Sequence, residues 1–368
     1  MFHVIPLQYY SAVFYTLMFV LCLAYGIAYS SSNSCEKLLK QHSLVPVILL
    51  ALVLILYVGM RPISWFFADM RMYAHTYEHG DIALLIGKSE WLFSALMIAC
   101  RYIGMSAQEY FLLVAFLYIF LGYMACQKLL PENAMLAFLF FISAFSFWGY
   151  ATNGIRNGLA GSICLLGIAY GIDKKWVTSL ILMYIALSVH RSMMLPIVMF
   201  LIATFVVKKP KVAILFWLLS IAMSLIMGQR IIQFFTHLGF DDRMINYGML
   251  AAQYGHQFSR TGFRWDFLLY SAVPVVITWY ISEKREIQDS CFNQLANTYI
   301  LANAFWIMVI QSAFSNRFAY LSWFIYPIVL AYAFIRVPVW ENQDRKAGWA
   351  LILHASFTIF MFMIGKLY

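Results

Sequence analysis

The sequence predicts an all-α fold, a polytopic integral membrane protein built as a bundle of about twelve spanning helices. Of its 368 residues, 63% are hydrophobic and only 11% are charged, and the mean hydropathy is +0.77. Soluble domains usually carry about 25% charged residues and are less than half apolar. The apolar runs are continuous over about 17–21 residues, as in spanning helices, and do not alternate over about ten residues as in membrane β-barrels.

The apolar runs take up almost the whole chain, so we expect a single transmembrane domain over residues 1–368. The N-terminus lacks a basic segment and a small-residue cleavage site, and we therefore interpret the first run as a retained span and not as a signal peptide. The predicted spans are 9–29, 43–60, 107–126, 133–150, 155–171, 175–190, 192–207, 211–228, 265–282, 294–313, 317–335 and 347–366.

Residues 90–104 are apolar but short, and they contain Glu90 and Arg101. They predict either a further span or a re-entrant or interfacial helix. If they do not cross, all the lysine-bearing short connections share one face, which the positive-inside rule makes cytoplasmic. We therefore prefer twelve spans plus a re-entrant or interfacial helix, with thirteen spans as the alternative. These connections are 30–42, 127–132, 172–175, 208–211, 283–292 and 336–346.

The two long polar segments, 61–89 and 229–264, fall on the opposite, external face in this topology. Loops longer than about 15 residues are often lids or binding loops, so we expect both to cover a polar site. The net charge of +9 comes from scattered basic residues, which marks orientation and not a nucleic-acid partner. The six cysteines show no CxxC or Cys/His spacing, so neither a metal site nor a disulfide framework is predicted.

Arg156 begins an apolar run just after Asn153 and Gly154. An ionisable residue in so apolar a segment is costly and usually faces an internal cavity. Its guanidinium matches phosphate oxygens, and the first N–H groups of a helix would face the same way. The alternative is an arginine that reaches the lipid headgroups. Asn153 and Asn157 make the neighbourhood polar and favour a site for an anion.

Two further polar points interrupt apolar runs on the same predicted face. His190 can move a proton near neutral pH or hydrogen-bond a neighbouring helix, and Arg191 is either a ligand or an interfacial anchor. Arg317 and Tyr320 lie one helical turn apart and repeat the arrangement at Arg156.

The first external segment contains candidate carboxylates. Asp69 and Tyr73 have the spacing of one helical face, so Asp69 could act as a base, orient a sugar hydroxyl, or pair with Arg61 or Arg71. Glu90 precedes an apolar segment, where a helix dipole also favours a carboxylate. Aromatic residues nearby suit sugar stacking, although membrane-interface belts explain most of them.

The ordered set of these residues resembles the EpsG-like and Wzy-type polymerases of exopolysaccharide, capsule and O-antigen. The likeness extends from about residue 57 to 325, with Asn at 157 where Gln is more usual in the family and Arg191 between the His and Ser. Its motifs are Gly59-x-Arg61, Asp69-x-x-x-Tyr73, Glu90, Asn153-x-Ile155-Arg156-Asn157-x-x-Ala160, His190-x-Ser192 and Arg317-x-x-Tyr320.

The resemblance implies a glycosyltransferase of the bacterial inner membrane that joins oligosaccharide repeat units carried on polyprenyl diphosphate, at the external or periplasmic face, without cofactor or metal. The growing chain would be transferred to an incoming unit. The expected partners of the protein are the lipid-linked glycan, membrane lipid and a chain-length regulator. The base is expected among His190, Asp69 and Glu90. The diphosphate ligands are expected to be Arg156, Arg317, Arg191 and Arg61, and the sugar contacts Tyr73, Asn153, Asn157 and Tyr320.

Other functions fit parts of the pattern. A flippase or transporter of lipid-linked oligosaccharide needs similar arginines, but it often shows two related halves, and none are evident here. A membrane O-acyltransferase acting on surface glycan could use an intramembrane histidine, yet a cytoplasmic donor should place its site on the other face. A glycosyltransferase using a lipid phosphate sugar would place an acidic residue early in its first external loop, as Asp69 permits.

Overall fold

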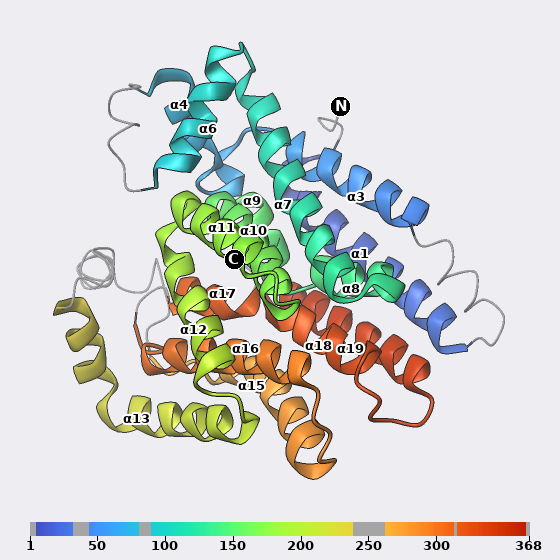
Figure 1. Cartoon of the computed structure of the whole chain (residues 1–368). Helices are drawn as coiled ribbons and strands as arrows, with labels where there is room; N and C mark the ends of the chain where they lie inside the picture. The colour runs from blue at the N-terminus through green and yellow to red at the C-terminus, as the bar shows by residue number, and fades with distance from the viewer. Residues whose placement is uncertain (1–4, 32–43, 81–89, 238–261, 313–314, 366–368) are drawn as a thin grey trace. The chain divides into compact units, whose positions relative to one another are not determined.

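The computed structural model describes residues 5–31, 44–80, 90–237, 262–312 and 315–365, and within these ranges it contains helices and no strand. Figure 1 shows their course along the chain. The α-helices are α1 (Leu7–Ser31), α3 (Leu44–Gly59), α4 (Met70–His79), α6 (Trp91–Tyr102), α7 (Ala107–Leu129), α8 (Ala134–Ile142), α9 (Phe147–Thr152), α10 (Ile155–Ile172), α11 (Trp176–Val189), α12 (Met194–Phe205), α13 (Pro210–His237), α15 (Trp265–Trp279), α16 (Ser290–Met308), α17 (Ser315–Trp323), α18 (Tyr326–Ile335) and α19 (Gln343–Met363).

Within the described ranges, 7 helical segments are long and apolar enough to cross a membrane, and shorter apolar helices accompany them. The long segments are Leu7–Ser31, Ala107–Leu129, Ile155–Ile172, Pro210–Phe234, Trp265–Lys284, Ser315–Ile335 and Gln343–Met363. The predicted class, an all-helical multi-pass membrane protein, is confirmed.

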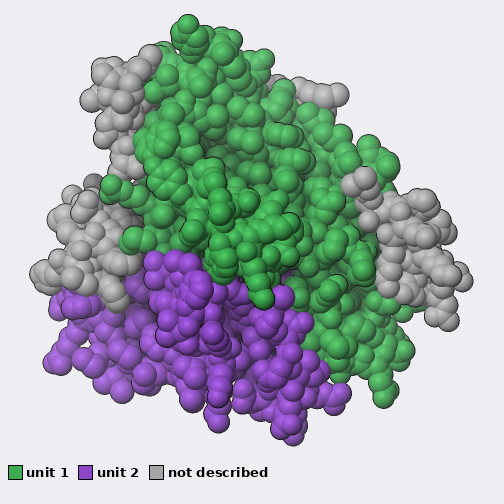
Figure 2. Space-filling view, in the orientation of Figure 1, with its two compact units in different colours: residues 1–197, 330–368 green, residues 198–329 purple. Residues whose placement is uncertain are grey.

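The helices form two compact units, coloured separately in Figure 2. Unit 1 contains residues 1–197 and 330–368, and unit 2 contains residues 198–329. In unit 1, α10 packs against α7 and α11, while α1 packs along α19. The approach of α1 to α19 requires glycine, because a Cβ on Gly26 would lie 2.8 Å from the carbonyl oxygen of Gly348.

One end of unit 1 gathers several of the predicted cytoplasmic connections. Lys128 Nζ lies 2.5 Å from Asp173 Oδ2, which joins the end of α7 to the end of α10. The hydrogen bond from Lys128 is the main reason why the pKa of the exposed Asp173 carboxyl is lowered. Tyr29 Oη donates to Asn133 Oδ1 and to Asp344 Oδ1, which brings the end of α1 and the start of α19 to the same end.

The opposite end of unit 1 holds both ends of α6. Gln108 Nε2, in the first turn of α7, donates to the carbonyl of Gly59 at the end of α3. Arg101, in the last turn of α6, donates to the carbonyl of Gly80 at the end of α4. The 12 residues of α6 extend about 18 Å, against a bilayer core of about 30 Å. At the start of α6, Glu90 contacts Arg156 in the first turn of α10, which is the end of α10 away from Asp173. Helix α6 therefore begins and ends at one end of the unit.

Some predicted boundaries differ in the structure. The span 133–150 is interrupted between α8 and α9. The span 317–335 matches the long apolar segment Ser315–Ile335, in which α17 and α18 follow one another. The external segment 61–89 contains the short 3-10 helix η2 (Trp65–Phe67) and α4, and its residues 81–89 lie outside the described ranges. The loop expected at 229–264 starts later, because α13 continues to His237; residues 238–261 lie outside the described ranges.

Unit 2 is held together by buried polar side chains on α16. Asn303 Oδ1 accepts a hydrogen bond from Trp217 Nε1 on α13 at 2.8 Å, and Asn303 Nδ2 donates to Ser322 Oγ on α17 at 3.0 Å. Asn303 is fully buried. In a membrane, apolar helix surfaces pack against lipid about as well as against each other, so hydrogen bonds between helices contribute to their association.

Candidate active site

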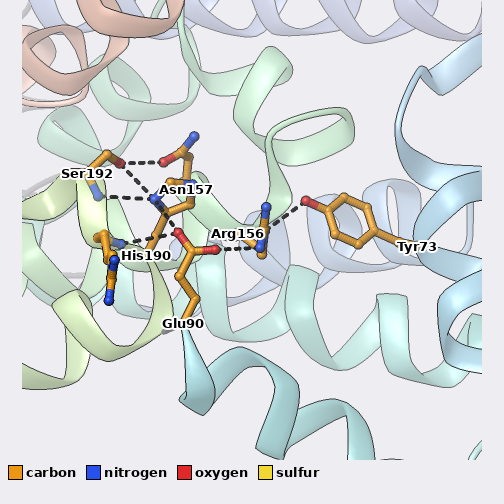
Figure 3. A network of polar contacts seen from close by, with 7 residues as sticks. Tyr73, Glu90, Arg156, Asn157, His190 and Ser192 are labelled. Atoms are coloured by element: carbon orange, nitrogen blue, oxygen red, sulfur yellow. Dashed lines mark hydrogen bonds and ion pairs between the residues drawn. The ribbon is translucent and has the colours of Figure 1, made fainter. Parts of the chain in front are cut away.

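The polar site lies at the end of unit 1 that also holds α6, and Figure 3 shows its side chains. Four parts of the chain contribute to it. Tyr73 comes from α4, Glu90 stands at the N-cap of α6, and Arg156 and Asn157 open α10. The fourth part is the turn between α11 and α12, with His190 and Ser192.

Glu90 links Arg156 to His190. Its Oε2 lies 2.5 Å from Nη1 of Arg156, and its Oε1 lies 3.2 Å from Nδ1 of His190. The backbone N–H of Arg191 also points to Oε1, at 3.4 Å. The side chain of Glu90 is only 12% exposed and that of Arg156 26%, so the ion pair is partly shielded from water.

Arg156 is held on its other side by aromatic residues. Its Nε donates a hydrogen bond to Tyr73 Oη at 3.0 Å. Its guanidinium also lies near the rings of Tyr73 and Phe93, with centroid distances of 5.7 and 5.9 Å. Burial raises the pKa of Tyr73, against the opposing effect of Arg156, so the phenol is protonated at neutral pH. Arg156 is therefore fixed in direction while a quarter of its side chain stays accessible.

His190 stands where the chain leaves α11 in an extended conformation, with φ −151° and ψ 121°. Ser192 Oγ donates to Asn157 Oδ1 at 2.9 Å and also lies 2.9 Å from His190 Nδ1. The backbone N–H of Ser192 donates to the same Nδ1 at 3.2 Å, and Glu90 Oε1 lies beside it. The carboxylate beside this nearly buried ring is therefore placed to stabilise an imidazolium.

The start of α10 adds backbone donors near Arg156. The N-cap is Gly154, which has no side chain to cap the helix. The first N–H groups of a helix have no partner within it and favour an anion. Asn153 precedes this N-cap, and its Oδ1 accepts a hydrogen bond from the N–H of Asp69 at 3.4 Å.

The remaining predicted residues lie in different surroundings. Asp69 is half-buried at the N-cap of α4, and the N–H of Tyr73 bonds to its carbonyl at 3.0 Å, which places the two one helical turn apart. Arg61 is 1% exposed and bonded to backbone carbonyls. Arg317, exposed, and Tyr320, half-buried against Trp323, both lie on α17 in unit 2.

Two residues of the network were not among the predicted ligands. Ser192 stood in a recognised motif, and its spacing of two residues from His190 signalled the contact that the turn makes. Phe93 gave no such signal, because an aromatic residue in an apolar helix has no distinguishing pattern. Among the residues that the structure describes, no group of three or more His, Cys, Asp or Glu side chains could hold a metal ion.

Comparison with known proteins identifies a matching family but no matching individual protein. No curated protein and no solved structure matches the chain. The model of the EpsG family matches residues 44–367, which is most of the sequence and includes every residue of the site described above. The chain belongs to the EpsG family, a Wzy-like family of exopolysaccharide polymerases.

Proposed function

We propose that the protein is a glycosyltransferase that joins oligosaccharide repeat units carried on polyprenyl diphosphate, at the external face of the bacterial inner membrane. Membership of the EpsG family supports a membrane exopolysaccharide polymerase. The observation that carries the finer proposal is the cluster of Arg156, Glu90 and His190, which puts a directed cation beside a carboxylate–histidine pair.

Arg156 binds the donor diphosphate in this proposal. Its accessible guanidinium and the first N–H groups of α10 are donors that suit phosphate oxygens. Arg191 is exposed one residue from His190 and adds a second cation. These groups stabilise the charge that develops on the diphosphate as it leaves the sugar, so the step needs no metal ion.

His190 acts as the base. The acceptor hydroxyl attacks the anomeric carbon, the bond from that carbon to the diphosphate oxygen breaks, and the imidazole of His190 takes the hydroxyl proton. Glu90, whose Oε1 lies 3.2 Å from Nδ1, stabilises the imidazolium that forms, as a carboxylate does in other His-dependent enzymes. Asp69 is the alternative base, and Tyr73, Asn153 and Asn157 are proposed to contact the sugars.

The unit 2 residues Arg317 and Tyr320 are proposed as a further diphosphate ligand and a further sugar contact. The family resemblance of the Arg317 motif is the ground for including them. Segments 61–89 and 229–264 are proposed to cover the site, within a single transmembrane domain.

For the topology we propose twelve spans and a re-entrant or interfacial α6. Two observations support this arrangement. Both ends of α6 lie at one end of unit 1, together with Glu90 and Arg156. Basic connections that include Lys128 are joined at the other end, which the positive-inside rule makes cytoplasmic.

The test is reconstitution of the purified protein with lipid-linked repeat units and no nucleotide sugar or metal. A ladder of lengthened lipid-linked glycan is expected from the natural protein. Arg156→Gln should reduce elongation by on the order of a hundredfold or more. Arg71→Gln is the matched control, because this exposed arginine lies over the ring of Trp65 at 5.8 Å.

A deletion strain separates the other classes. Single repeat units left on the lipid carrier support the polymerase. Loss of all external glycan indicates a flippase, and full-length glycan that lacks acetyl groups indicates an O-acyltransferase; either result refutes the proposal. Normal-length polymer from both Arg156→Ala and Arg317→Ala would refute the diphosphate assignment, and co-purification with elongation activity tests for a chain-length regulator.

A further inference from the structure

Among the residues of unit 1 that the structure describes, Arg61 is the largest buried charged side chain, and its surroundings do not suit a substrate ligand. It is 1% exposed. Its Nη1 donates to the carbonyl of Val58 and its Nη2 to the carbonyl of Thr152, the latter at 3.1 Å. The rings of Phe67 and Phe111 lie 5.6 and 5.7 Å from its Cζ. A diphosphate would have to displace these contacts to reach the guanidinium.

The two carbonyls belong to the last turns of two helices. Val58 lies at the end of α3, and Thr152 is the last residue of α9. The last four carbonyls of a helix have no partner within it, and each C-terminus carries the equivalent of roughly half a negative charge. Two helix ends therefore converge on one guanidinium and accept from both of its Nη atoms, while the buried Nε has no hydrogen-bond partner among the described residues.

The position of Thr152 connects Arg61 to the active site. Thr152 is followed by Asn153 and Gly154, and then by Ile155 and Arg156 in the first turn of α10. Residues 152–155 form this short connection between α9 and α10, which we call the elbow. The elbow determines the position of Arg156 at the start of α10.

A second set of bonds fixes the chain around Arg61 itself. Gln108 Nε2 donates to the carbonyls of Gly59 and Arg61, at 2.7 and 3.1 Å. The N–H of Asp69 donates to Asn153 Oδ1. The segment that begins with Arg61 and carries Tyr73 is thus tied to the elbow that carries Arg156.

We propose that Arg61 is a positioning residue, which caps the ends of α3 and α9 together and so sets the place of Arg156 relative to Tyr73 and Glu90. Arg61 does not touch the diphosphate and acts on it through Arg156. The effect on donor binding rests on the proposed function, whereas the effect on the elbow does not.

The test compares Arg61→Met with Arg61→Lys and with Tyr57→Phe. Methionine keeps the apolar volume and removes both donors, and lysine keeps the charge without the planar fork that reaches two carbonyls. Tyr57→Phe removes another buried bond of the same region, from Tyr57 Oη to the carbonyl of Tyr10 at 2.7 Å. It is the control for a general loss of stability.

The first measurement is the Kd of the full-length protein in nanodiscs for polyprenyl diphosphate. Arg61→Met should weaken binding by about tenfold, the order expected when charge-assisted hydrogen bonds that fix a ligand are lost. Arg61→Lys should lie between it and the natural protein, and Tyr57→Phe should bind as the natural protein does. In the background of Arg156→Gln, the Arg61→Met change should have no further effect. An additive loss in the double variant would overturn the proposal.

The second measurement is amide hydrogen exchange at the elbow, which stays informative if the natural protein binds no polyprenyl diphosphate and the proposed function fails. The N–H of Gly154 bonds to Gly149 and that of Gly158 to Gly154, at 2.9 and 2.8 Å. Arg61→Met should speed exchange at these two amides more than Tyr57→Phe does. Equal exchange in the two variants would refute the role of Arg61.

Discussion

Glu90→Gln separates the two roles that this carboxylate has in the proposed mechanism. The change keeps the shape and an acceptor for the N–H of Arg191, but it removes the counter-charge of Arg156 and His190. Loss of assistance to a general base lowers kcat by about 10²–10⁴-fold, which corresponds to about 3–5 kcal/mol of transition-state free energy. Breaking the ion pair should also cost stability. Because 26% of the Arg156 side chain is exposed, we expect about 1–2 kcal/mol, below the 3–5 kcal/mol typical of a fully buried pair.

The two roles predict different effects on the KM for the donor and on kcat. With Glu90 neutral, Arg156 no longer has a competing carboxylate, so the KM for the lipid-linked donor should stay equal or fall while kcat falls. Initial rates of elongation in proteoliposomes over a range of donor concentrations give both constants, and Arg156→Gln provides the contrast, with a raised KM. If Glu90→Gln raised the KM and left kcat unchanged, Glu90 would be a donor ligand and the pairing with His190 would have no catalytic role.

Three further predictions address stability and topology. Asn303→Leu leaves Trp217 Nε1 without its acceptor and should lower the free energy of unfolding by about 1–3 kcal/mol, measured by thermal denaturation in detergent, with Arg71→Gln unchanged. Gly158→Ala places a Cβ 2.8 Å from the carbonyl oxygen of Tyr150, so α9 must move from α10 and elongation should fall, whereas unchanged glycan length would contradict the tight packing. Cysteines at Tyr102 (91% exposed) and at the exposed Lys175 should react with a membrane-impermeant maleimide from outside and from inside the cell, respectively, and labelling from the same side would refute the proposed topology.

The sequence was sufficient to locate the polar residues, because each interrupts or begins an apolar run where charge is costly. It was also sufficient for the helical relation of Asp69 to Tyr73, which depends only on local spacing. The pairing of Glu90 with Arg156 could not be predicted from the sequence, since 66 residues separate the two. They come together because α6 packs against α11, which itself packs against α10.

The environment of Arg61 could not be predicted from the sequence. An arginine just after an apolar helix has the same sequence pattern whether it reaches the headgroups, binds a substrate or turns inward. Burial against the carbonyls of Val58 and Thr152 depends on α9 ending beside α3. That ending follows from the interruption between α8 and α9, where the sequence Ser143-Ala-Phe-Ser146 contains neither Gly nor Pro to signal it.

In the proposed reaction cycle, Glu90 has a role both before and after the donor binds. An arginine that is mostly shielded from water needs a counter-charge when no diphosphate is present, and Glu90 provides it. When a diphosphate takes over the guanidinium, the carboxylate still has two donors within reach, the imidazole of His190 and the N–H of Arg191. Binding of the donor therefore strengthens the contact of Glu90 with His190 at the point when the imidazole must accept a proton. Donor binding and activation of the base are thus coupled through one carboxylate, and the coupling predicts that Arg156→Gln lowers kcat as well as donor affinity.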